Sequence, residues 1–134
     1  MRKKLDGGAR ILLTRLQARG YGAYIVGGAV RDMLRGATPH DYDIATSAVP
    51  AQTRAVFTDL RTYDTGAAHG TVSVIYNGKT YEITTFRRDG AYSDGRRPDA
   101  VEFTGDLCED LARRDFTVNA MAMDADGRVC DPFS

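Results

Sequence analysis

The acidic residues of this chain offer the clearest chemistry. Asp41 and Asp43 belong to the run Asp41-Tyr42-Asp43-Ile44-Ala45-Thr46, whose alternation of acidic with apolar or small side chains predicts a strand with two different faces. Side chains two apart on a strand share a face, so the two carboxylates would lie about 6 to 7 Å apart along one surface. This pairing is costly unless cations offset the repulsion. Oxygen ligands of this kind suit Mg²⁺, and two such ions can activate an attacking hydroxyl and stabilise a leaving phosphate oxygen.

An Asp-x-Asp triplet is also common among solvated loop charges, so its context decides its meaning. Glu82 lies in a second predicted strand, where Tyr81 and Ile83 occupy the opposite face. If that strand lies beside the Asp41 strand, Glu82 becomes a third metal ligand or the base-like partner of the attacking hydroxyl. The alternative is a solvent-facing acid on a sheet that is buried on one side only.

The pair Gly27-Gly28 precedes a short predicted helix. Such a turn lets the backbone approach a phosphate, with the first amides of the helix as donors and Arg31 as a charged partner one turn on. Neither the G-x-G-x-x-G pattern nor the Walker G-x-x-x-x-G-K-[ST] pattern is present, which excludes the two commonest nucleotide-binding motifs. For the glycines alone a tight structural turn is the simpler explanation. Their coupling to the acid pair, which follows thirteen residues after Gly28, supports a role in phosphate binding.

A second basic group, Arg113-Arg114-Asp115, falls in a stretch with helical periodicity. Adjacent helical arginines point about 100° apart, so one can reach a ligand while the other pairs with an acid, although alone they would be an ordinary surface pair. His40 and His69 stand apart from any serine or cysteine and are assigned no catalytic role.

The surrounding pattern predicts the elements that must position these residues. A strand, a glycine turn and a helix come first after an initial amphipathic helix, and a hairpin follows through Asn77-Gly78. We expect helices at Gly8–Arg19, Ala29–Arg35, Pro50–Leu60 with Ser47 as a cap, and Asp106–Ala122, and strands at Ala23–Val26, Asp41–Thr46, Gly70–Tyr76 and Thr80–Phe86. Arg87–Pro98 is expected to be a mobile excursion rather than a strand, and no closing element is expected at the C-terminal end.

Composition limits the class of protein. The 134 residues carry 18 basic and 18 acidic side chains and 43% hydrophobic residues, which indicates one soluble globular domain that does not grip polyanions by bulk charge. Residues 1–40 hold eight basic and two acidic side chains, so this part would face phosphate, or would be a helix with a solvated basic face. Cys108 and Cys130 fit reduced thiols, and no apolar run resembles a membrane span, so we expect a cytoplasmic protein.

Three motifs in order match a known family. Tyr24-Ile25-Val26-Gly27-Gly28-Ala29-Val30-Arg31-Asp32, the Asp41–Thr46 run and the segment from Glu109 to Ala122 closely resemble the head domain of bacterial class II tRNA nucleotidyltransferases and their poly(A) polymerase relatives. These proteins belong to the DNA polymerase beta superfamily. The resemblance covers about residues 10 to 133.

The resemblance implies an α+β nucleotidyltransferase palm, with a mixed, mostly antiparallel sheet flanked by helices. Asp41 and Asp43 would hold two Mg²⁺ ions, and Glu82 would be the third carboxylate. Gly27, Gly28, Arg31 and Arg114 would bind the nucleoside triphosphate, and Asp115 would orient Arg114 or contact the ribose. The segment Arg87–Pro98 occupies the place of the family's flexible loop, which takes part in the change from adding C to adding A.

The implied reaction is attack of an RNA 3′-hydroxyl on the α-phosphate of CTP or ATP, which adds CCA to the 3′ end of tRNA by positioning and charge neutralisation. The family reads the incoming base and holds the RNA with neck, body and tail domains, and we expect these to be absent from residues 1–134. Two alternatives stay open: a head that makes poly(A) tails, and a metal-triphosphate binding module that does not extend RNA.

Overall fold

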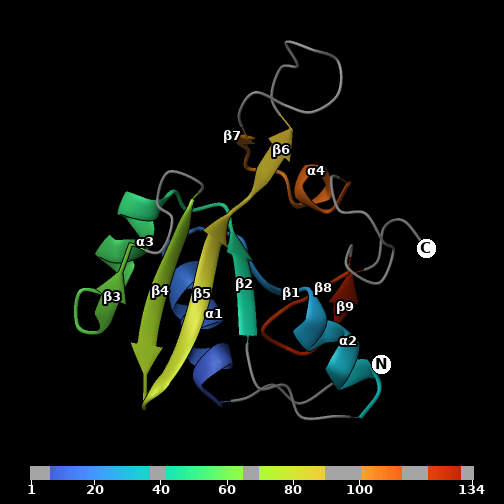
Figure 1. The fold of residues 1–134 in the computed structure, drawn as a ribbon, viewed down its shortest axis with the longest axis horizontal. Helices are drawn as coiled ribbons and strands as arrows, with labels where there is room; N and C mark the ends of the chain where they lie inside the picture. The colour runs from blue at the N-terminus through green and yellow to red at the C-terminus, as the bar shows by residue number, and fades with distance from the viewer. Residues whose placement is uncertain (1–6, 37–41, 65–69, 90–100, 113–120, 131–134) are drawn as a thin grey trace.

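The protein is built around one large sheet. The computed structural model describes residues 7–36, 42–64, 70–89, 101–112 and 121–130 (Figure 1). Its seven-stranded sheet has the order β3-β4-β5-β2-β1-β8-β9, and β6 and β7 form a separate two-stranded ribbon. Within the large sheet only β2 and β5 pair in parallel. The expected α+β fold with a mixed, mostly antiparallel sheet is therefore confirmed.

The elements follow the predicted order, with additions. The strands are β1 (Ala23–Val26), β2 (Tyr42–Thr46), β3 (Arg61–Tyr63), β4 (Thr71–Tyr76), β5 (Lys79–Thr85), β6 (Arg87–Asp89), β7 (Val101–Phe103), β8 (Ala122–Met123) and β9 (Val129–Cys130). The helices are α1 (Gly7–Ala18), α2 (Gly28–Leu34), α3 (Pro50–Val56) and α4 (Leu107–Ala112). In the described part of the chain no helix is long and apolar enough to cross a membrane.

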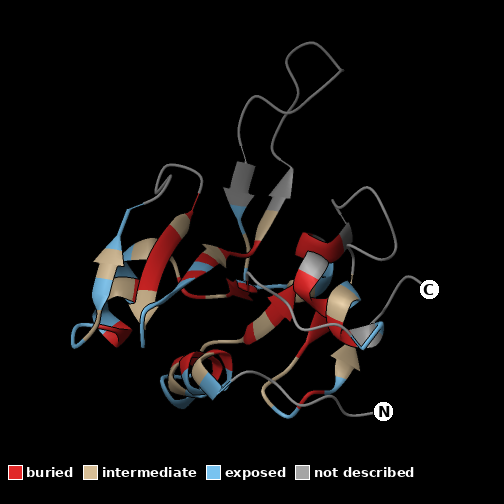
Figure 2. Cartoon of the chain, turned by 60° about the horizontal axis from the view of Figure 1, so that its bottom comes forward, coloured by how far each residue is buried: buried red, intermediate tan, exposed pale blue. Residues whose placement is uncertain are grey.

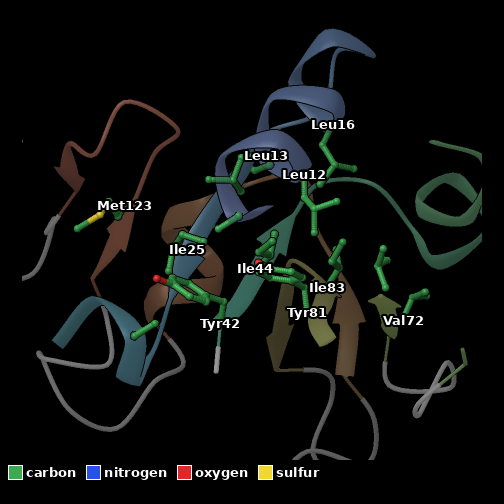
Figure 3. Close-up of a cluster of buried hydrophobic side chains, with 14 of the residues drawn as sticks. Leu12, Leu13, Leu16, Ile25, Tyr42, Ile44, Val72, Tyr81, Ile83 and Met123 are labelled. Atoms are coloured by element: carbon green, nitrogen blue, oxygen red, sulfur yellow. The ribbon is translucent and has the colours of Figure 1, made fainter. Parts of the chain in front are cut away.

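Alternate residues along the strands point to opposite faces of the sheet, and each face has its own cluster of buried side chains. One face packs against α1, which lies behind the sheet in Figure 1, and Figure 3 shows Leu12, Leu13 and Leu16 of this helix above the strands. Strand residues on that face include Ile25, Tyr42, Ile44, Val72, Tyr81, Ile83 and Met123. The other face is covered in part: Val26, Ala45, Phe86, Leu111 and Ala122 form a smaller cluster that includes α4.

The predicted hairpin is confirmed and shows how local sequence sets register. Asn77 has φ 51° and Gly78 has φ 79°, the left-handed pair that a tight two-residue turn requires. Tyr76 consequently pairs with Lys79, and the ladder continues to Thr71 opposite Thr84.

The helix predicted from Pro50 to Leu60 is shorter than expected. It ends at Val56, and a strand that was not predicted, β3, follows it at the sheet edge. Val49 rather than Ser47 is its first capping residue, and the Val49 N–H donates to Gln52 Oε1 at 3.0 Å. The Ser47 hydroxyl instead accepts from the Gly22 N–H at 2.9 Å, which ties the end of β2 to the start of β1.

Two further boundary predictions are wrong. Arg87–Asp89 is a strand, because it pairs with β7 as the base of a ribbon; residues 90–98 of the expected excursion lie outside the described residues. The helix expected to reach Ala122 is α4 up to Ala112, and Ala122 itself is in β8. The C-terminal part does have a closing element, since β8 pairs with β1 and β9 pairs with β8.

An arginine on α1 fastens the helix layer to the segment before β3. Arg15 donates to both carboxylate oxygens of Asp59 and to the Val56 carbonyl, and its guanidinium lies 5.0 Å from the centroid of the Phe57 ring. The hydrogen bond from Arg15 is the main reason that the pKa of Asp59 lies below its ordinary value of 3.8.

We predict that Asp59→Asn lowers stability at neutral pH and that the difference from the unmodified chain closes in acid. A carboxyl whose pKa is lowered by folding stabilises the folded state above its unfolded value of 3.8 and loses this contribution as the pH falls through its folded pKa. Thermal unfolding followed by circular dichroism across this range checks the prediction. A gap that persists unchanged in strong acid would contradict it.

Candidate active site

Asp43 and Glu82 lie side by side on the open part of the sheet. Asp43 on β2 is in register with Glu82 on β5, and adjacent strands are about 4.8 Å apart. Both residues are exposed. They line a hollow of about 290 Å³ together with Tyr42 and Thr80. The expected role of Glu82 requires its strand to lie beside the aspartate strand, and the two strands are neighbours in the sheet.

Burial on the opposite face holds this register. Tyr42 and Ile44 flank Asp43, while Tyr81 and Ile83 flank Glu82, and all four are buried. The Tyr42 and Tyr81 rings lie 5.9 Å apart between centroids. A slip of one residue would bring these apolar side chains to water and carry the carboxylates into the core. The core therefore fixes which side chains face the hollow.

Thr80 is a lining residue that sequence reasoning missed. The sequence alone could have placed Thr80 on this face, because Thr80 precedes Glu82 by two residues and so shares its face of β5. A threonine in a strand carries no functional signal of its own, since β-branched residues are ordinary there.

The turn at Gly27 reaches the same edge of the site. Gly27 has φ 75° and ψ −145°, a conformation open almost only to glycine, and its carbonyl accepts the Val30 N–H at 3.2 Å as α2 begins. A β-carbon built on Gly27 would lie 3.5 Å from Asp43 Oδ2, so the turn backbone passes directly beside that carboxylate. The predicted coupling between the glycine pair and the acids is seen for Gly27 and Asp43.

Arg31 projects from the helix that follows this turn. Its side chain is 47% exposed, and its Nε lies 3.9 Å from Asp32 Oδ1, a weak surface pair that leaves the guanidinium accessible. The helix packs against β1 and β2, so its position is tied to that of the Asp43 strand. Gly28 is the first residue of α2.

Three of the predicted site residues cannot be compared with the structure. Asp41, Arg114 and Asp115 lie outside the described residues. Among those that are described, no group of three or more His, Cys, Asp and Glu side chains could hold a metal ion. The two carboxylates that the structure does bring together, exposed and beside a hollow, nevertheless fit the oxygen donors that Mg²⁺ prefers.

We predict that Gly27→Ala destabilises the fold by about 1–3 kcal/mol, since a β-carbon disfavours this backbone conformation. It should also weaken triphosphate binding. Gly7→Ala is the matched control, because no atom lies within 4 Å of its added β-carbon and its φ is not positive. Thermal unfolding and a nucleotide titration measure both effects, and equal behaviour of the two variants would refute the role given to the turn.

Comparison with known proteins agrees with this geometry. The family described as "Poly A polymerase head domain" matches residues 23–134. The CCA-adding enzymes of Lactobacillus johnsonii and Geobacillus stearothermophilus are each 54% identical over 122 residues, which is 91% of this chain and 30% of theirs. This chain thus spans about 30% of the length of these curated relatives.

Solved structures give the same result. The CCA-adding enzyme of Bacillus stearothermophilus in complex with CTP superposes with a TM-score of 0.81 at 49% identity, covering 93% of this chain and 29% of that one. A tRNA nucleotidyltransferase with a primer tRNA and an incoming ATP analog has a TM-score of 0.65 at 29% identity, covering 91% of this chain and 34% of that one. The chain belongs to the poly A polymerase head domain family.

Proposed function

We propose that this chain is the catalytic head of a tRNA nucleotidyltransferase that adds CMP and AMP from CTP and ATP to the 3′ end of tRNA. The observation that carries the proposal is the register of Asp43 beside Glu82, next to the Gly27 turn. The high identity to CCA-adding enzymes over 91% of the chain supports the choice of reaction. An enzyme that acts on tRNA in this way would work in the cytoplasm.

Asp43 and Glu82, together with Asp41, would hold two Mg²⁺ ions. When bound there, Mg²⁺ supplies charge neutralisation for the phosphates and lowers the pKa of the attacking hydroxyl. Both described carboxylate residues are exposed at the surface of the sheet, where metal and substrate would approach. The buried side chains beneath them keep the two strands from separating, which is the positioning that this reaction needs.

The chain's other residues would bind the triphosphate. Gly27 and Gly28 permit close approach of backbone to phosphate, and Arg31 would pair with phosphate oxygens. Arg114 and Asp115 are proposed to contact the nucleotide as well. Because α2 lies on the β1 side of Asp43, the triphosphate would lie toward β1, and the RNA 3′-hydroxyl would approach from the Glu82 side.

Two alternative functions can be distinguished by which nucleotides are added to RNA. The family description itself favours testing poly(A) synthesis, in which ATP alone is added repeatedly. The short span relative to the curated relatives favours testing whether the chain binds metal and triphosphate without extending RNA. The assay uses tRNA that lacks its terminal CCA, with each nucleoside triphosphate in turn, and compares the chain with a chimera that places it in the Geobacillus stearothermophilus enzyme.

We predict that Asp43→Asn and Glu82→Gln each lower Mg²⁺-dependent nucleotide incorporation by the chimera at least about 100-fold, since metal neutralisation contributes several kcal/mol to the transition state. Removal of the metal with EDTA should abolish incorporation. Asp126→Asn, an exposed carboxylate in the turn between β8 and β9, is the control and should retain activity.

Full activity of either site variant would reject the metal assignment. Addition of ATP alone in long runs would favour poly(A) synthesis. Triphosphate binding by the chain, together with a chimera that incorporates nothing, would favour the binding-module alternative.

A further inference from the structure

The edge strand β3 presents an aromatic and a basic side chain on the same face as the carboxylates. Successive register partners across the sheet are Tyr63 with Ser73, Ser73 with Glu82, and Glu82 with Asp43. Directly paired residues share a face, so Tyr63 stands in the same row as both acids. Arg61, two residues earlier on β3, shares that face. Figure 1 shows β3 at the left edge, beyond β4 and β5, and Figure 2 shows this edge largely exposed.

Both side chains are available to a ligand. Tyr63 is 50% exposed, one of the few large hydrophobic side chains left open among the described residues, and Arg61 is exposed as well. Within the described part of the chain, neither side chain makes a hydrogen bond, an ion pair or a ring contact beyond the backbone pairing of β3 with β4. We call Arg61 and Tyr63 together the β3 platform.

The acids that flank the β3 platform are already neutralised. Asp59 is held by Arg15 of α1, and Asp64 pairs with Arg54 of α3 at 2.5 Å. Both of these ion pairs use arginines from the helix layer, on the opposite side of the sheet from the carboxylate row. The positive charge of Arg61 is therefore not cancelled by its neighbours in sequence, although it lies in a stretch that alternates acids and bases.

The direction of the reaction brings RNA toward this platform, an argument that rests on the proposed function. In phosphoryl transfer the attacking and leaving oxygens lie roughly in line. With the triphosphate on the side of Gly27 and Arg31, the attacking RNA strand must come from the other side, across β5, β4 and β3. Two strand spacings of about 4.8 Å separate Tyr63 from Glu82, close to the length of about three stacked nucleotides at 3.4 Å each.

We propose that the β3 platform binds the single-stranded 3′ end of the RNA primer. The Tyr63 ring stacks on a base two or three nucleotides before the 3′-hydroxyl, and Arg61 contacts a backbone phosphate. A stacking ring with an adjacent cation is the usual means of holding single-stranded nucleic acid without reading its sequence. Such a contact suits a primer whose last bases change as nucleotides are added.

The test measures binding of a short fluorescent single-stranded RNA to the 134-residue chain by anisotropy, at low and higher salt. Tyr63→Ala should weaken binding about tenfold, whereas Tyr63→Phe should keep it. Arg61→Ala should weaken binding and reduce the dependence on salt by about one counterion. Ile11→Ala and Arg10→Ala are matched controls, since both residues are exposed on α1 behind the sheet and should bind RNA like the unmodified chain.

A second readout uses the chimera with the CCA-adding enzyme. Tyr63→Ala should raise the KM for the RNA primer about tenfold and leave kcat and the KM for CTP unchanged. If Tyr63→Ala changes neither the RNA affinity nor the primer KM, the RNA-binding role of the β3 platform is wrong, whether or not the chimera extends RNA. The same result is expected if β3 instead binds a protein strand through its backbone edge. If the chimera extends nothing but Tyr63→Ala still weakens RNA binding, the proposed function fails and the platform stands.

Discussion

The parallel pairing of β2 with β5 determines which side chains meet at the candidate active site. Among the described strands of the large sheet it is the only parallel pair, and α3, β3 and β4 lie between its two strands along the chain. Parallel strands cannot be joined by a tight turn, so no local connection sets this register, and side-chain packing must select it. This packing lies beneath the carboxylates and consists of Tyr42 and Ile44 on β2 with Tyr81 and Ile83 on β5.

One face of the sheet packs into the core and stabilises the fold, and the other face carries the residues of the candidate active site. The face against α1 carries the larger core, and its burial resists any slip that would exchange Asp43 or Glu82 with an apolar neighbour. On the other face a smaller cluster packs against α4, whereas Asp43, Glu82 and Tyr63 are exposed, and Ser73, which lies between Glu82 and Tyr63, is buried. A mixed sheet with one partly solvated side thus serves here as a surface on which polar groups are set at fixed spacing.

The sequence predicted the local features well, because each has a local cause. Asn77-Gly78 favours a left-handed turn wherever it occurs, and the leucine spacing of α1 needs only a face to bury. The alternation around Asp43 and Glu82 correctly indicated which side chains share a face. The assembled core decides that the two strands are neighbours and sets their register. The sequence could therefore predict the role of Glu82 only on the condition that the two strands pair.

The elements that the sequence did not predict are strands of two or three residues. β3 has only three residues and no buried side chain, so nothing marked it except its pairing with β4. Asp126-Gly127, with Gly127 at φ 83°, is the turn signal for the β8–β9 hairpin, and Ala122, which helical periodicity assigns to the preceding helix, begins β8. Asp124 stabilises this turn, since its carboxylate accepts the N–H groups of Asp126 and Arg128.

We propose that Asp43 and Glu82 together bind the divalent cation that serves nucleotidyl transfer. The most direct measurement is a crystal structure of the chain with Mn²⁺ and a non-hydrolysable CTP analogue, with the metal located by anomalous scattering. We expect a peak at about 2.1 Å from oxygens of both carboxylates, with the triphosphate on the Gly27 side. A bound nucleotide whose metal contacts neither carboxylate, or lies elsewhere on the sheet, would contradict it.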